Sequence, residues 1–119
     1  MFAGCTNLTS VDFSKLGNKY DSDMDHMFDG CINLTYVNID NLIIKDTTYM
    51  FKDCILLTSI DLSKIDITNA QNLEYMFTGC ISLQVINLKG FKLDSVTSIE
   101  RMFDNCYSLK YLDLSSFKP

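Results

Sequence analysis

Five cysteines are the residues of this sequence with the greatest capacity for chemistry, and they recur at nearly regular intervals. They are Cys5, Cys31, Cys54, Cys80 and Cys106. A zinc site needs converging ligands such as a C-x2-C pair, and the sequence contains no such pair. A disulfide framework pairs its cysteines, but the count is odd, and identical side chains stacked on adjacent units point in parallel. The spacing therefore favours reduced thiols packed in an interior.

The stretch YDSDMDH is a second candidate site, because Asp21, Asp23 and Asp25 alternate as they do at the start of a calcium loop. A helix–loop–helix calcium site also needs Gly at the sixth position and Glu at the twelfth, where this sequence has His26 and Ile32. His26 is the only histidine, so a Ser-His-Asp or Cys-His hydrolase would depend on it. Only one of the repeated units described below carries it. We therefore expect no enzyme activity, no metal site and no cofactor.

The sequence segments that would position these residues occur in five similar copies. A Met-Phe pair begins each repeat at residues 1, 27, 50, 76 and 102, and a cysteine follows four residues after each methionine. The chain divides into repeats 1–26, 27–49, 50–75, 76–101 and 102–119, which we interpret as one leucine-rich-repeat domain. The second repeat is three residues short, and Thr47 takes a position that is apolar elsewhere. We expect that coil to be tighter and the stack to be distorted there.

Each repeat predicts one short strand and one short helix. A period-2 pair such as Ile60 and Leu62 is typical of a strand with one buried face. Before the cysteine, Leu73, Met76 and Phe77 have the i, i+3, i+4 spacing of one or two helical turns. The residue preceding each cysteine belongs to a type that tolerates positive φ and ends helices. These residues are Gly4, Gly30, Asp53, Gly79 and Asn105.

Stacking the five repeats predicts the fold. Strands of three or four residues gain stability by pairing with equivalent strands of the neighbouring repeats, about 4.8 Å away. The expected architecture is an α/β solenoid of five coils, with a short parallel β-sheet and short helical turns. We expect the repeated apolar columns to form its core, and the last of these columns is Leu16, Leu42, Ile65, Phe91 and Phe117.

The phrase M-F-x-x-C-x-x-L-x-x-[VIL]-[DN]-[LIF], with connecting segments such as SKIDITNAQNLEYMF, resembles the BspA-like leucine-rich repeats. The resemblance covers Met1 to Phe117. Repeats of this kind occur in bacterial and protozoan surface proteins and lipoproteins. The resemblance implies a leucine-rich-repeat solenoid located outside the cell or on its surface, often in adhesion or host contact. It carries over no catalytic residues, because the family motif is structural.

The side chains that point outward from the predicted strands are the candidates for binding. The residue between the two buried strand positions alternates between Asp and Asn: Asp12, Asn38, Asp61, Asn87 and Asp113. This alternation separates like charges and places amide donors beside carboxylates, so it stabilises the sheet. The neighbouring column adds Tyr and Val. We expect the strand face to bind a protein or glycan on a host or neighbouring cell. The candidate binding residues are Tyr36, Asp61, Val85, Asn87 and Tyr111.

Composition limits the partners. With 47% hydrophobic and 21% charged residues the chain can build a packed interior. A net charge of −5 argues against nucleic acid and against adsorption to anionic lipid. The longest aliphatic cluster, 42–44, argues against direct membrane insertion. No sequence resembles a cap for the outer coils, which predicts a fragment of a longer surface protein or end-to-end self-association. The alternative function is a passive structural spacer without a ligand of its own.

Overall fold

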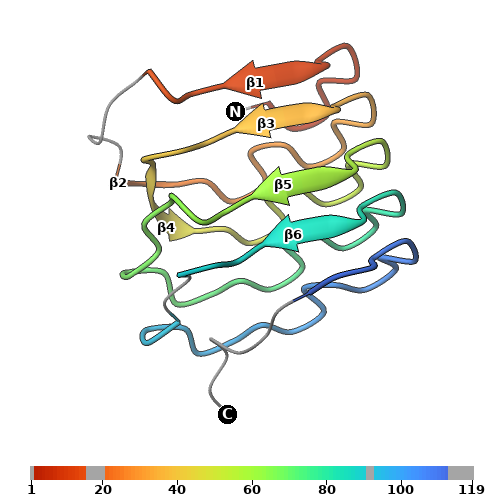
Figure 1. Ribbon diagram of the computed structural model, residues 1–119. Helices are drawn as coiled ribbons and strands as arrows, with labels where there is room; N and C mark the ends of the chain where they lie inside the picture. Colours follow the sequence, from red (N-terminus) through yellow and green to blue (C-terminus); the bar gives the residue numbers. More distant parts are fainter. Residues whose placement is uncertain (1, 16–20, 91–92, 113–119) are drawn as a thin grey trace.

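One short parallel strand follows the cysteine in each of the first four coils, where a coil is the chain from one Met-Phe pair to the next. The computed structural model describes residues 2–15, 21–90 and 93–112. Four strands follow the cysteines: β1 (Ser10–Asp12), β3 (Tyr36–Asn38), β5 (Ser59–Asp61) and β6 (Val85–Asn87). Figure 1 shows these four strands side by side, one in each successive coil. We call their outward surface the strand face.

The predicted period-2 pattern of these strands is confirmed. The central residues Val11, Val37, Ile60 and Ile86 are buried, and the residues that flank them point outward. Two further strands, β2 (Asp21–Asp23) and β4 (Ile43–Asp46), lie on the segments that return from the strand face. Neither strand was predicted from the sequence. Both β2–β4 and the pairs on the strand face are parallel, as expected for successive coils of one handedness.

The predicted helical turns are wrong, because none of the residues that the structure describes is helical. The segment before each cysteine, which we call the turn segment, covers 24–31, 47–54, 73–80 and 99–106. In 24–31 the N–H groups of Met27, Asp29 and Cys31 each donate to the carbonyl three residues earlier, over 3.0–3.1 Å. These are consecutive β-turns, which replace the i→i−4 bonds of an α-helix. Apolar residues spaced by three or four suit both arrangements.

Alternate N–H groups of the turn segment bond to the next coil. His26, Phe28 and Gly30 donate to carbonyls of residues 48, 50 and 52 over 2.8–2.9 Å. The next two turn segments repeat this pattern. The N–H groups of residues 49, 51 and 53 donate to the carbonyls of 74, 76 and 78. Those of residues 75, 77 and 79 donate to the carbonyls of 100, 102 and 104. An α-helix would keep these N–H groups for its own carbonyls. Stacking against the neighbouring coil therefore competes with helix formation and prevails.

Two residues of each turn segment have positive φ. One is the residue before the cysteine, as predicted, with φ of 76°, 59°, 81° and 61° at Gly30, Asp53, Gly79 and Asn105. Gly4, which precedes Cys5 in the first coil, has a φ of 72°. The other, which was not predicted, precedes the methionine. It is His26, Tyr49, Tyr75 or Arg101, with φ of 57°, 58°, 57° and 53°. Each residue of this second group is the third residue of a β-turn, where positive φ is typical of type II turns.

The strand row is interrupted between the second and third coils. β1 pairs with β3 and β5 pairs with β6, but no pairing joins β3 to β5 within the described residues. On the return side, β2 and β4 change register between Ser22 and Asp23. The short second coil carries both β3 and β4. The predicted distortion at this coil is therefore confirmed.

The core consists of columns with one residue from each coil. Phe28, Phe51 and Phe77 are fully buried and stack with ring centroids 5.4 and 5.5 Å apart. The predicted apolar columns are buried at Leu34, Leu57, Leu83, Ile39, Leu62, Leu88 and Leu42. Thr47 is also fully buried, and its hydroxyl donates to the Asn72 carbonyl over 3.3 Å. The predicted core residues Leu8, Phe13, Ile65, Leu109 and Leu112 are only half-buried. Leu16, Phe91, Leu114 and Phe117 lie outside the described residues.

Candidate functional site

The residues predicted to bind lie on the strand face and are exposed. Tyr36 is 52% exposed, Val85 42% and Tyr111 63%. Asp61 on β5 and Asn87 on β6 are exposed as well. Large apolar and aromatic side chains that remain accessible beside polar groups are typical of interaction surfaces. The strand face therefore has the composition of a binding surface in this part of the chain.

The structure brings these residues together in two groups. Parallel register places Asp61 directly opposite Asn87. Val85 is bridged to Tyr111 in the next coil, so these two side chains are neighbours. Tyr36 lies apart from Val85 and Tyr111, because the third coil carries Ser59 in the same column. Tyr36 instead shares an opening with Asp61.

This opening lies where β3 and β5 are unpaired. It has a volume of about 250 Å³ and is lined by β3, β5 and the adjacent Thr35 and Asp40. Tyr36 and Asp61 are the two predicted residues that it includes. Asp40, Ser59 and Thr35 also line the opening, and none of them was predicted as a site residue. The short second repeat signalled a distortion here, but not an opening.

Carboxylates on the strand face also accept hydrogen bonds from residues that follow the strands. Asp61 Oδ1 accepts the Ser63 N–H over 2.8 Å and the Ser63 hydroxyl over 2.6 Å. These two hydrogen bonds, followed by smaller contributions that include Asn87, lower the pKa of Asp61 below its ordinary value. Asp12 is held by Ser14 in the same way, and its pKa is also lowered. Both carboxylates are therefore ionised at neutral pH.

The asparagines of this column act in the same way as the aspartates. Asn38 accepts the N–H of Asp40, and Asn87 accepts the N–H of Lys89, each over 3.0 Å. The predicted stabilising role of the Asp/Asn column thus includes a local one. Each side chain caps the backbone two residues further along its own coil, as Asp and Asn commonly do in turns.

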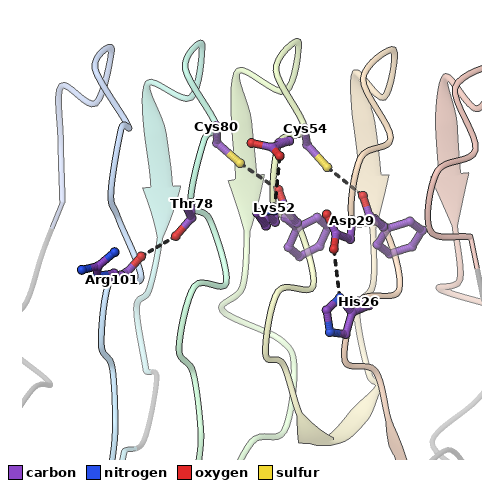
Figure 2. A network of polar contacts seen from close by, with 10 residues as sticks. His26, Asp29, Lys52, Cys54, Thr78, Cys80 and Arg101 are labelled. Carbon is purple, nitrogen blue, oxygen red and sulfur yellow. Dashed lines mark hydrogen bonds and ion pairs between the residues drawn. The ribbon is translucent and has the colours of Figure 1, made fainter.

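The cysteine thiols are directed at backbone carbonyls of the preceding coil. Cys54 Sγ donates to the Phe28 carbonyl over 3.2 Å, and Cys80 Sγ donates to the Phe51 carbonyl over 3.0 Å, as Figure 2 shows. Cys31 and Cys106 make the same contact. All five cysteines are free. The predicted burial is confirmed at Cys31, Cys54 and Cys80, whereas Cys5 and Cys106 are only half-buried.

Burial makes these thiols poor nucleophiles. It raises the pKa of Cys54 to about 12 and that of Cys106 to about 11, and it also raises the pKa of Cys31 and Cys80. A thiol that stays protonated at neutral pH neither attacks an electrophile nor binds a metal readily. No group of three or more His, Cys, Asp or Glu that could hold a metal ion occurs within residues 2–15, 21–90 and 93–112.

His26 is exposed and belongs to an aromatic column on the turn segments. Its Nδ1 atom lies 2.9 Å from Asp29 Oδ2 (Figure 2). Its ring stacks on Tyr49, which stacks on Tyr75, with both pairs of centroids 4.7 Å apart. His26 is therefore one member of a column of stacked rings that connects successive coils.

Successive coils that pair through short parallel strands, with apolar columns inside and an exposed strand face, define the class of leucine-rich-repeat proteins. The family model described as "BspA type Leucine rich repeat region (6 copies)" matches residues 1–118. The chain belongs to this BspA-type leucine-rich-repeat family. No curated protein and no solved structure matched the chain. In the described part of the chain, no helix has the length and apolar character needed to cross a bilayer.

Proposed function

We propose that this chain is a cell-surface interaction and adhesion module, built as a leucine-rich-repeat solenoid of one domain, that binds a protein or glycan through its strand face. The observation that carries the proposal is the exposure of Tyr36, Val85 and Tyr111 on one face. Membership of the BspA-type family supports it, because repeats of this type suggest a surface interaction module. The extracellular or cell-surface location is part of the same proposal.

The polar groups of the strand face suit recognition better than catalysis. Asp12 and Asp61 hold serine donors of their own coils, and their lowered pKa values oppose a role as general acids at neutral pH. The thiols are directed into the stack. We therefore propose a module without enzymatic activity, which presents a preformed surface to its partner.

Adhesion tests this proposal with a matched control. A variant with Tyr36→Ala, Val85→Ala and Tyr111→Ala removes the exposed apolar groups of the strand face. Tyr107→Ala is the control, because Tyr107 is 78% exposed but follows Cys106 in a turn, away from the strands. Beads coated with each protein are applied to host cells, to neighbouring cells and to a glycan array. We expect adhesion to fall only for the strand-face variant.

The second candidate is a passive spacer without a ligand. The hydrogen bonds that Asp12 and Asp61 make within their own coils favour it, because they give these side chains a purely structural role. Equal adhesion of the strand-face variant and the unmodified chain would establish the spacer and remove the binding proposal. Circular dichroism of both variants confirms that the substitutions leave the fold intact.

We also propose that coils of two molecules can stack end to end. In the first coil Phe2, Leu8 and Phe13 are half-buried, whereas the equivalent residues of the second coil are fully buried. An apolar side left accessible in this way can be covered by a further coil or by another copy. Sedimentation equilibrium over a range of concentrations tests this. A monomer at every concentration would contradict self-association.

A further inference from the structure

We propose that the opening between β3 and β5 binds the guanidinium group of an arginine side chain on a partner protein. This inference rests on the proposed function, because it assigns a partner chemistry to the strand face. It commits to a protein partner with an exposed arginine. A lysine or a neutral group in the same position is an outcome that the experiment below distinguishes.

The first argument is the shape of the opening. Paired strands such as β5 and β6 leave no space between their backbones, but β3 and β5 are unpaired and the surface is hollowed between them. Its volume of about 250 Å³ is large enough for one long side chain and too small for a folded element. The opening therefore suits a single residue that projects from the surface of a partner.

The second argument is the charge of the lining. Among the described residues that line the opening, Asp40 and Asp61 are the only charged ones, so this lining carries two negative charges and no positive one. Lys64, which follows on the chain, acts on Asp61 and contributes to lowering its pKa. The backbone N–H of Asp40 donates to Asn38, but its carboxylate has no hydrogen bond or ion pair with any residue that the structure describes. A cation would balance a charge that this part of the chain leaves unpaired.

Comparison with the equivalent coils shows why Asp40 is unusual. Ser14 and Ser63 occupy its position in the first and third coils, and their hydroxyls donate to Asp12 and Asp61 over 2.6 Å. A carboxylate cannot donate in this way when ionised. In the second coil the side chain at this position is therefore half-buried at the edge of the opening, and its carboxylate has no partner among the described residues.

The third argument is Tyr36. Its exposed ring lines the same opening, together with the acceptor oxygens of Asn38 and Ser59. A guanidinium group is planar, stacks on aromatic rings and carries five donors that match carboxylates bidentately. An ammonium group offers three donors on a compact charge and stacks poorly. The combination of ring and carboxylates therefore favours arginine over lysine.

Nuclear magnetic resonance of the isotope-labelled full chain tests the inference with three probes. These are the N-acetyl, N-methylamide derivatives of arginine, lysine and citrulline, of which citrulline is the neutral isostere of arginine. We expect saturable shifts of the Tyr36, Asp40 and Asp61 amides with the arginine probe, weaker shifts with lysine and none with citrulline. Added salt should weaken the arginine binding.

Matched variants locate the site. Asp40→Asn should weaken arginine binding about tenfold, since a charge-assisted hydrogen bond is lost. Asp12→Asn is the control, because Asp12 has the same serine cap as Asp61 but lies on β1, outside the opening. It should leave the affinity unchanged. Asp40 makes no described side-chain contact, so its substitution tests binding without disturbing the fold.

Three results would overturn the inference: no saturable shift at these amides, equal binding of citrulline and arginine, or equal weakening by Asp40→Asn and Asp12→Asn. Adhesion separates this failure from failure of the proposed function. If the strand-face variant loses adhesion while arginine fails to bind, the binding face stands and only the arginine assignment falls. If arginine binds while adhesion survives the triple substitution, the arginine site is supported and the adhesive role of the strand face is contradicted.

Discussion

Each buried cysteine acts as a hydrogen-bond donor as well as an apolar side chain. The Phe28 carbonyl accepts the Cys31 N–H from its own coil over 3.0 Å and the Cys54 thiol from the next coil over 3.2 Å. Both lone pairs of a buried carbonyl are thus used. Alanine would leave one of them empty, and serine would place a more polar group in an apolar column. This explains why the repeat carries a cysteine and not merely a small apolar residue.

Thiol labelling should follow burial. Cys31, Cys54 and Cys80 should react slowly in the folded chain, while the half-buried Cys5 and Cys106 react first. A thiol reagent followed by peptide mapping with mass spectrometry measures the rate at each site. Labelling of Cys54 as fast as Cys5 would contradict the burial of this column.

Alkaline pH should destabilise the fold through the same thiols. The pKa of Cys54 is raised from the ordinary 9.0 to about 12, so below pH 9 the thiol is protonated whether the chain is folded or unfolded. Above pH 9 the unfolded chain loses this proton and the folded chain keeps it. The free energy of unfolding then falls by about 1.4 kcal/mol per pH unit for each such thiol.

Urea unfolding between pH 7 and 11 measures this loss. Cys54→Ala should be less stable than the unmodified chain at pH 7, since it leaves a cavity and an unfilled acceptor. Its stability should nevertheless decline less steeply above pH 9, because one titrating thiol is gone. Parallel declines for the two proteins would show that Cys54 ionises equally in both states.

At the level of elements, the conformation of the turn segment was only partly predictable from the sequence. Gly, Asn and Asp before the cysteines indicated a left-handed backbone, and the structure has it. Tyr49 and Tyr75 adopt the same conformation without any such signal, since tyrosine is not among the residue types enriched there. The helix prediction failed because consecutive β-turns have the same apolar spacing as a helix. The hydrogen bonds to the next coil favour the β-turns over the helix.

The candidate site was predictable to a similar extent. Alternation along the strands placed Tyr36, Asp61 and Val85 outward, because side-chain direction follows from a period of two. The opening depends on β3 and β5 remaining unpaired, which is a property of two coils and not of either sequence segment. Asp40 belongs to the proposed arginine site only because of that opening.

Gly79→Ala should be markedly destabilising. A Cβ at Gly79 would overlap Oδ1 of Asp53 in the preceding coil, and the φ of 81° adds strain. Gly4→Ala is the matched control, because its φ of 72° is similar but no atom lies within 4 Å of a Cβ there. We expect a loss of about 1–2 kcal/mol for Gly4→Ala, the usual left-handed penalty, and a larger loss for Gly79→Ala.

Thermal or urea unfolding compares the two variants, and a double variant isolates the overlap. Adding Asp53→Gly to Gly79→Ala removes the overlapping carboxylate and should reduce the loss to that of the control. Equal losses for the two single variants would mean that the Asp53 side chain moves aside without penalty.

At the scale of the whole molecule, stability comes from columns that each coil shares with its neighbours. Leu62 is fully buried in the third coil, with a coil on either side. The described hydrogen bonds between coils likewise join neighbours, through the turn segments 24–31, 47–54 and 73–80 and through the thiols. A repeat protein of this kind has no single centre, and its stability is approximately a sum over coils and their interfaces.

Leu62→Ala should lower the free energy of unfolding by about 2–5 kcal/mol, the range for a fully buried leucine. Leu56→Ala is the control, because Leu56 is 45% exposed in the same coil. It should change stability by less than about 1 kcal/mol. Urea unfolding measures both. A small loss at Leu62 would mean that the strand faces the other way.

Bonding between neighbouring coils alone also determines how the molecule would respond to mechanical tension. A pull along the stack loads one interface after another, so coils should peel off singly while the rest stay folded. A released coil of 26 residues lengthens the tether by about 90 Å, and the coil of 23 residues by about 80 Å, at roughly 3.5 Å per extended residue. In the adhesion module proposed above, this stepwise release of coils would absorb mechanical work between the cell and its partner.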